Sequence, residues 1–353
     1  MRSSQVLHAG LPQEEWLPSA RVGGDAVMLV RRHNCIVNLT VRSLFRYLRP
    51  PPGRLHVISA LAYKNCPQIR ALHPRILCHD ESSILPGLNA SSVANALEKA
   101  HLGSLKHLGG WYLQQFLKLA FATSALRTSA AYLVWDSDTV LVRPYAPILL
   151  EQQQSRRARP KLRILVGGWS GGNAVYAEGL SRLLPRVPWY RSAAYGNLTA
   201  VMHQALFYSP WVLELLSGIS RTSAGGRGKT DAEVGSSARL PLWASRSLLA
   251  MAPPWPPTKP SWKLHGKLFS EYGFYASWVM HHHASDVIAE PSFQCRLRTN
   301  HTAPCPDERD TMVASYCQPG RHRPHYVTFE QHLSLVNVNS RASGDRAGGS
   351  RGL

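Results

Sequence analysis

Short apolar runs alternate with amphipathic segments along most of the chain. The runs are rich in β-branched and aromatic residues, which predicts buried strands. These predicted strands cover residues 25–30, 55–59, 76–81, 131–135, 162–166 and 326–329, and residues 198–210 form a further β-favouring run with one polar break. Apolar positions at helical spacing predict helices within residues 37–48, 109–122, 211–219 and 269–283. This alternation predicts an α/β fold with a mostly parallel central sheet flanked by helices.

The first predicted strand, helix and second strand form one β-α-β unit. Such a unit implies parallel strands joined by a right-handed crossover, as in Rossmann-type sheets. Open α/β sheets bind ligands outside the carboxyl ends of their strands. The third predicted strand ends in two acids, Asp80 and Glu81, and position alone makes Asp80 a candidate contact for a nucleoside. Beyond residue 289 we expect an irregular C-terminal extension, apart from the strand at 326–329.

Two acids, Asp136 and Asp138, follow directly on the predicted strand 131–135. Burying an unpaired carboxylate is costly, so we expect this pair at an edge or cleft. Two oxygen ligands this close suit a hard divalent cation such as Mg²⁺ or Mn²⁺, with coordination positions left for substrate phosphates. The alternative is that the acids only end a strand and begin a turn.

The helix predicted within 109–122 carries polar residues beside an apolar face. Gln114 and Lys118 are four positions apart and therefore neighbours on the helix, with Gln115 nearby. One interpretation is a surface amphipathic helix with incidental polar groups. The other is that Lys118 and the glutamines, Gln114 and Gln115, approach a bound diphosphate.

Histidines near two apolar segments are further candidates. His203 lies within the β-favouring run 198–210 and is either a satisfied buried histidine or a cleft-facing ligand. His281, His282 and His283 end the helix predicted within 269–283, and a single cleft-facing histidine there, which we assign to His283, can complete a metal site. At the other end, Glu271 falls in the first turn, where a carboxylate is favourable with the helix dipole.

The chain is strongly basic, with 40 Lys and Arg against 21 Asp and Glu and a net charge of +19. Such a balance fits either a polyanionic partner or a compositional bias of loops and tails. The densest clusters lie near residues 156–161 and 321–323 and lack interleaved aromatic residues for base stacking. We therefore expect that the basic residues reflect the composition of loops and tails, and we expect no specific nucleic-acid partner.

The evidence on compartment points two ways. No apolar stretch reaches the roughly 18 residues of a membrane-spanning helix, and residues 1–21 lack the apolar segment of a secretory signal peptide. Four Asn-x-Ser/Thr sequons nevertheless favour a secretory lumen, with the cytoplasm as the alternative; they begin at Asn38, Asn89, Asn197 and Asn300. Of six cysteines, we expect Cys295, Cys305 and Cys317 to pair if the compartment is oxidising.

Composition also suggests the domain boundaries. We expect a flexible leader over residues 1–24, one catalytic domain over 25–339 and a disordered tail over 340–353. Two insertions are expected within the domain, a Gly- and Ser-rich one at 221–239 and a Pro-rich one at 251–260.

Four segments together resemble a largely uncharacterised glycosyltransferase-like family with the GT-A nucleotide-sugar fold. They are, in order, Gly110-Trp-Tyr-Leu-Gln-Gln-Phe-Leu-Lys118, Leu133-Val-Trp-Asp136-Ser-Asp138-Thr139, Val201-Met-His-Gln-Ala-Leu-Phe207 and Phe269-Ser-Glu-Tyr-Gly-Phe-Tyr275. The resemblance implies that Asp136 and Asp138 hold a nucleotide-sugar diphosphate through Mn²⁺ or Mg²⁺. It also implies that His203 and Glu271 lie near the sugar or the acceptor. The chain departs from the family pattern in its insertions and in Gly-Phe after Ser-Glu-Tyr, where an acidic-apolar pair is commoner.

The function expected from these features is metal-dependent transfer of a sugar from a nucleotide-sugar donor to a glycan, protein or small-molecule acceptor. Lys118 supplements charge neutralisation, and Glu271 is the candidate general base if the reaction inverts configuration. One rival is a haloacid-dehalogenase-type phosphohydrolase, in which Asp136 is the nucleophile. That rival needs a second acid pair after a later strand, and none is evident. The other rival is a non-catalytic homologue that only binds the nucleotide sugar.

Overall fold

The computed structural model describes residues 24–99, 103–149, 161–167, 173–195, 197–222, 240–251, 268–292, 294–298 and 326–330. The predicted leader up to residue 23, the predicted tail and most of both predicted insertions lie outside these ranges. Within the described helices, none is long and apolar enough to cross a bilayer.

A five-stranded sheet forms the centre of the molecule. Its strands follow the order β3 (Ile76–Asp80), β2 (Arg54–Ser59), β1 (Asp25–Leu29), β4 (Ala131–Asp136) and β8 (Gln204–Tyr208). The first four are parallel, and β8 is antiparallel to β4. Every residue of β1 is buried, as expected for a parallel strand covered on both faces.

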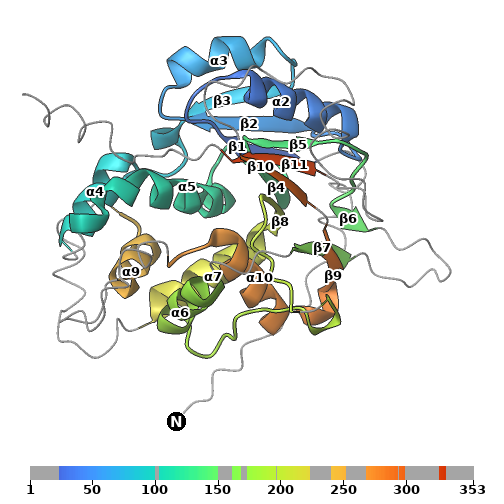
Figure 1. Cartoon of the computed structure of the whole chain (residues 1–353). Coiled ribbons are helices and arrows are strands. Elements are labelled where there is room, and N and C mark those ends of the chain that lie inside the picture. The colour runs from blue at the N-terminus through green and yellow to red at the C-terminus, as the bar shows by residue number, and fades with distance from the viewer. Residues whose placement is uncertain are drawn as a thin grey trace, which may run out of the picture.

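Helices cover both faces of this sheet (Figure 1). On one face lie α2 (Cys35–Tyr47) and α3 (Ala62–Arg70), and on the other lie α5 (Gly109–Ala120), α7 (Ser209–Arg221) and α10 (Glu271–His282). The remaining helices are α4 (Ala90–Lys99), α6 (Asn173–Leu183) and α9 (Leu242–Ala250), with short 3-10 helices η1 (Glu81–Ser83), η2 (Gly103–Leu108), η3 (Phe121–Thr123), η4 (Ala193–Tyr195) and η6 (Ala284–Asp286). The α/β architecture with a mostly parallel central sheet, predicted from the sequence, is confirmed.

Local signals explain where two of these helices begin. Asn34 precedes α2, and its side-chain oxygen accepts a hydrogen bond from the Val37 backbone N–H at 3.0 Å. Ser270 precedes α10 and accepts from the Gly273 N–H at 3.2 Å. Each cap satisfies an N–H group that would otherwise lack a partner in the first turn. The cap at Ser270 therefore sets the position at which Glu271 enters its helix.

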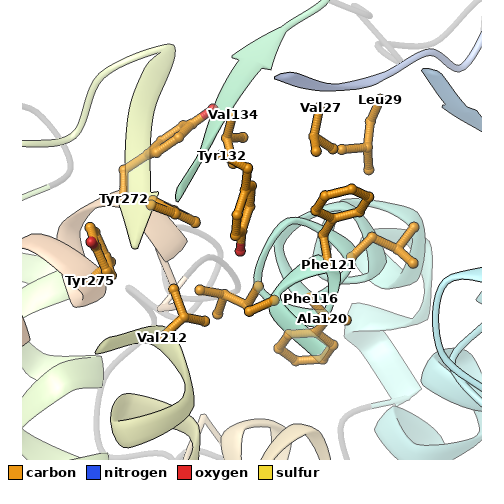
Figure 2. Packing of buried hydrophobic residues seen from close by; sticks show 14 of the residues in the cluster. Val27, Leu29, Phe116, Ala120, Phe121, Tyr132, Val134, Val212, Tyr272 and Tyr275 are labelled. Atoms are coloured by element: carbon orange, nitrogen blue, oxygen red, sulfur yellow. The ribbon is translucent and has the colours of Figure 1, made fainter. Parts of the chain in front are cut away.

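The core between the sheet and α5 is aromatic. Figure 2 shows Val27 of β1 and Tyr132 of β4 facing Phe121, just beyond the end of α5. The Tyr132 and Phe121 rings meet edge to face, with centroids 5.1 Å apart. The Tyr132 hydroxyl also donates to the Lys118 carbonyl oxygen at 2.9 Å. This contact ties α5 to the strand that carries the two acids.

Two small sheets flank the central one. One consists of β6 (Ile148–Leu149), β7 (Lys161–Val166) and β9 (Val287–Pro291), and the other of β10 (Gln294–Arg298), β11 (Tyr326–Glu330) and β5 (Thr139–Leu141). The strand predicted at 162–166 therefore exists, but it pairs outside the central sheet. In the C-terminal extension, the strand predicted at 326–329 is confirmed as β11. Strands β9 and β10 were not predicted, because they find partners far away in the sequence.

The cysteines differ in part from the expectation. Cys66 of α3 and Cys78 of β3 form a disulfide, and Cys35 is also disulfide-bonded. The sequence did not single out Cys66 and Cys78, because nothing local shows that the helix and strand pack together. Cys305 and Cys317 lie outside the described residues, and Cys295 lies on β10.

Candidate metal centre

The candidate site lies at the carboxyl end of β4. Asp136 is the last residue of this strand and pairs in register with Leu29 at the end of β1. The neighbouring β8 runs the opposite way, so its beginning meets the end of β4. His203 immediately precedes β8, and its carbonyl oxygen accepts from the Asp136 N–H at 2.9 Å. The antiparallel pairing of β4 and β8 thus brings His203 to the acids.

Three side chains gather there with the chemistry of a metal site. Asp136, Asp138 and His203 each offer one ligand atom, and these atoms lie within 4.8 Å of one another. In the described part of the chain, this is the one such group of three or more His, Cys, Asp or Glu residues. Two carboxylates and an imidazole suit a divalent cation that accepts both oxygen and nitrogen, such as Mn²⁺. The residues present therefore fit the cation that the motifs imply.

The turn that carries the acids is held by elements on both sides. The Thr40 hydroxyl of α2 donates to the Ser137 carbonyl oxygen at 3.1 Å. The Phe329 N–H of β11 donates to the Asp138 carbonyl oxygen at 2.8 Å. With its backbone fixed at two points, the turn keeps both carboxylates on the same rim of the sheet.

A buried ammonium group bridges two carboxylates at this site. Lys118 is only 5% exposed. Its Nζ lies 2.7 Å from Asp136 Oδ1 and 2.6 Å from Glu271 Oε1. It also donates to the Tyr272 hydroxyl oxygen at 3.2 Å and lies 4.5 Å from the centre of that ring. Burial lowers the Lys118 pKa, but the charges of Asp136 and Glu271 outweigh it and raise the pKa above its ordinary value.

Asp136 is held by donors on both of its oxygens. Besides Lys118, Oδ1 accepts from the Tyr272 hydroxyl at 2.8 Å, and Oδ2 lies 3.0 Å from His203 Nδ1. Burial raises the Asp136 pKa, but Lys118 and His203 lower it well below its ordinary value. Asp136 is therefore an oriented, ionised carboxylate at the pH of cells.

Asp138 is less well compensated. Burial, together with the negative charge of Asp136, raises the Asp138 pKa to about 6. The hydrogen bond to its side chain from the Thr139 hydroxyl is long, at 3.4 Å. Additional positive charge beside Asp138 is therefore favourable, as expected at a site that takes a cation.

The structure changes the setting of Glu271. Its carboxyl group, 1% exposed, lies against Lys118 rather than on an open surface. Burial raises the Glu271 pKa, and the Lys118 charge opposes that rise. A general base must reach the hydroxyl group of an acceptor. The base role stays a prediction, and the observed placement favours a counter-ion.

His283 lies away from the metal-ligating group. Its Nε2 is 2.7 Å from Glu214 Oε2, and its ring stacks on Trp211 at 4.6 Å. It caps the C-terminal end of α10, a helix of 12 residues, so about 18 Å of helix separates it from Glu271 at the other end. The histidine that the structure places with the aspartates is His203, so the assignment to His283 is corrected.

Two other predicted residues are Asp80 and Gln115. Asp80 is exposed, and its carboxylate accepts from the Ser82 N–H at 3.0 Å and the Ser82 hydroxyl at 2.6 Å. Gln115 lies on α5 and is buried. Among the contacts that the structure describes, neither residue bonds Asp136 or Asp138, and their proposed contacts with a donor remain predictions.

Tyr272 is a site residue that sequence reasoning did not assign. Its hydroxyl group links Lys118 and Asp136, as described above. The available signal was its place in the Phe269-Ser-Glu-Tyr segment, next to Glu271. A tyrosine on a helix with an otherwise apolar face is more often a core residue, so the pattern alone did not reveal the contact.

The phosphohydrolase alternative finds no support in this arrangement. Three strands precede the acid-bearing strand in the chain. The described residues hold no second carboxylate pair in a metal-ligating group with Asp136. Glu271, the other acid near Asp136, is paired with Lys118.

Fold and site together define an α/β protein with a candidate divalent-cation centre at the carboxyl edge of a mostly parallel sheet. No protein-family model matches the chain, and no curated protein sequence matches it. Among solved structures, the chain is similar to the apo form of mouse xyloside xylosyltransferase 1, with a TM-score of 0.37 and 10% identity. That similarity covers 77% of this chain and 88% of the mouse chain. Two chains with this TM-score need not share a function, so the site itself carries the inference below.

Proposed function

We propose that this protein is a metal-dependent glycosyltransferase that takes its sugar from a nucleotide-sugar donor. The observation that carries the proposal is the group of Asp136, Asp138 and His203 at the carboxyl edge of the sheet. The four sequence segments that resemble a glycosyltransferase-like family support it, because each of them supplies residues of this site. The first three contribute Lys118, the aspartates and His203, and the fourth contributes Glu271 and Tyr272.

Each residue has a role that follows from its contacts. Asp136, Asp138 and His203 would hold the cation, Mn²⁺ or Mg²⁺. When bound, the cation supplies a Lewis acid that offsets the charge of a departing nucleoside diphosphate. Lys118 and Tyr272 orient the Asp136 carboxylate before any ligand arrives. This preorganisation lowers the cost of arranging the site when the donor binds.

The contacts of Lys118 also indicate whether its ammonium group binds the diphosphate of the donor. Its single positive charge is shared between Asp136 and Glu271, which lie at 2.7 Å and 2.6 Å. A buried ammonium group paired in this way is not free to leave its partners for a phosphate. We therefore assign Lys118 to the support of Asp136 rather than to direct contact with the diphosphate.

The test is a panel of nucleotide sugars scored for release of nucleoside diphosphate by the full chain, with Mn²⁺, Mg²⁺ or a chelator. We expect cation-dependent release with at least one donor. The Asp138→Asn variant should lose activity by roughly 100-fold or more, because it removes a ligand charge. Glu98→Gln is the matched control, since Glu98 is exposed on α4 and pairs only with the exposed Lys106 among the described contacts.

Two outcomes would contradict the proposal in different ways. Equal release by wild type and Asp138→Asn would remove the assigned site. Cation-dependent binding of a nucleoside diphosphate, measured by calorimetry, without turnover of any donor would instead identify a non-catalytic binding protein.

A further inference from the structure

The sequons of this chain occupy very different structural positions. Asn38 lies within α2 and is half-buried, and its Oδ1 is 2.7 Å from His33 Nε2. The threonine of the same sequon, Thr40, is fully buried and bonds the turn between the two aspartates. A glycan on Asn38 would have to displace the His33 contact on a helix that packs against β5.

Asn89 is used as a helix cap. Its side-chain oxygen accepts from the Ser92 N–H at 2.9 Å, and its own N–H donates to the Ser92 hydroxyl at 3.0 Å. These reciprocal bonds form the first turn of α4 and leave Asn89 half-buried. The fourth sequon, at Asn300, lies outside the described residues.

Asn197 is different, because it is exposed and lies in a turn. Its φ of 61° is in the left-handed region, which asparagine tolerates better than most residues. Its backbone N–H donates to the Ser192 carbonyl oxygen at 2.9 Å, so the turn is anchored while the side chain remains at the surface. The sequon threonine, Thr199, is buried, and its carbonyl oxygen accepts from the Gly167 N–H at 2.9 Å.

The disulfides supply an independent indication of the compartment. Cys66 and Cys78 are joined, and Cys35 is also disulfide-bonded. Structural disulfides persist in oxidising compartments such as the secretory lumen and are rare in the cytosol. That lumen is also where asparagine sequons receive glycans.

We propose that Asn197 carries an N-linked glycan, acquired in an oxidising secretory lumen. The co-substrate is a lipid-diphosphate-linked oligosaccharide. A bond forms between Asn197 Nδ2 and the anomeric carbon of the sugar, and the bond from that carbon to the diphosphate breaks. The amide nitrogen loses one proton, and the lipid diphosphate leaves with the bonding electrons. The proposal does not depend on the proposed catalytic function.

The test is expression of the full chain in eukaryotic cells behind a cleavable secretory leader, which delivers it to the lumen where sequons receive glycans. Purified protein is then treated with an amidase that cleaves N-glycans in heavy-oxygen water. A glycosylated asparagine is thereby converted to an aspartate that carries heavy oxygen, and peptide mass spectrometry locates it. We expect the label in the peptide that contains Asn197 and unlabelled asparagine at Asn38.

Two variants keep the test specific. Asn197→Asp removes the acceptor amide while retaining a residue that tolerates the left-handed conformation, so it should fold and lose the label at this position. Thr199→Ser keeps the sequon and should retain the label. An unlabelled Asn197 in folded wild-type protein would overturn the proposal, as would labelling of Asn38 or Asn89 in its place.

Discussion

Lys118 Nζ and Glu271 Oε1 lie 2.6 Å apart, although the two residues are separated by 153 positions in the chain. Both side chains are buried, so each charge depends on the other for compensation. Breaking a buried pair by removing one partner leaves an uncompensated charge in a poorly solvated environment. The helices α5 and α10 are thus held together by an ion pair at the same place where they support Asp136.

Removal of the ammonium group should destabilise the fold strongly. Lys118→Met leaves Asp136 and Glu271 without their shared counter-ion, and we expect a loss of about 3–5 kcal/mol in the free energy of unfolding. Urea denaturation followed by circular dichroism measures this loss. Lys106→Met is the matched control, because Lys106 and Glu98 are 57% and 61% exposed and their pair should contribute less than about 1 kcal/mol. Equal losses for the two variants would contradict the assignment.

A double-mutant cycle separates a counter-ion role for Glu271 from a general-base role. We expect Glu271→Gln to cost stability in the wild-type background and little or nothing in the Lys118→Met background, where its partner is gone. The coupling free energy should be about 1–3 kcal/mol. The general-base assignment would be restored by two results together. The stability losses of Lys118→Met and Glu271→Gln would have to be additive, and Glu271→Gln would have to lose turnover while keeping its stability.

The two histidine assignments make opposite predictions for metal binding. His203→Gln should weaken Mn²⁺ binding by roughly 10–100-fold, because His203 would supply a ligand and its Nδ1 lies 3.0 Å from Asp136 Oδ2. His283→Gln should leave Mn²⁺ affinity unchanged, since His283 pairs with Glu214. Isothermal titration calorimetry measures both affinities. A selective loss in His283→Gln would reverse the assignment made from the structure.

Metal addition should also raise the stability of the folded chain. A cation that binds only the native state raises the free energy of unfolding by about 2.7 kcal/mol when its free concentration is 100 times its Kd. We therefore expect the unfolding midpoint to rise with Mn²⁺ in wild-type protein and to fall back when a chelator is added. The same titration on Asp138→Asn should show a much smaller rise, and an equal rise would place the cation elsewhere.

Asp25 should make the stability depend on pH in the acid range. Burial raises its pKa, but the His56 imidazole, whose Nε2 lies 3.4 Å from Asp25 Oδ1, and hydrogen bonds from the Thr128 N–H and hydroxyl outweigh this and lower the pKa from 3.8 to about 2. Because the folded-state pKa is depressed, the stabilisation is fully present above pH 3.8 and is lost as the pH falls through about 2. The difference corresponds to about 2 kcal/mol. Denaturation curves between pH 5 and pH 2 should show this extra loss in wild type and not in Asp25→Asn.

Two helical glycines should respond in opposite ways to alanine. At Gly179 of α6, an added Cβ would overlap the backbone carbonyl oxygen of Leu268, which cannot move as a flexible side chain would. We expect Gly179→Ala to be destabilising by about 1–3 kcal/mol. At Gly110 of α5 nothing lies within 4 Å of an added Cβ, so Gly110→Ala should stabilise by about 0.5–1 kcal/mol through helix propensity. Thermal unfolding measures both, and the same sign at both sites would contradict the prediction.

Much of the fold was predictable because its signals are local. The apolar runs at β1 and β4 are strands since their length, composition and flanking residues leave few alternatives. The apolar face of α5 and the turn residues around it act through neighbours three or four positions apart. Such patterns also placed Asp136 and Asp138 at the end of a buried strand, where the structure has them.

Strand pairing was not predictable in the same way. The β7 run is as apolar as a central strand, yet it pairs with β6 and β9 in a separate sheet. The β8 run joins the central sheet in the antiparallel direction. Strand pairing depends on contacts between segments that are distant in the sequence. The apolar sequence of one strand therefore does not show which strand it pairs with or in which direction.

The sequence by itself determined the α/β class, the position of the acid pair and the residue types available for a metal site. Only the tertiary structure decided that His203 rather than His283 joins the acids, and that Lys118 is shared between Asp136 and Glu271. The physical reason is that ligands and ion pairs require atoms within a few ångströms of each other. Those distances arise when β8 pairs against β4 and α10 packs on α5, not from spacing along the chain.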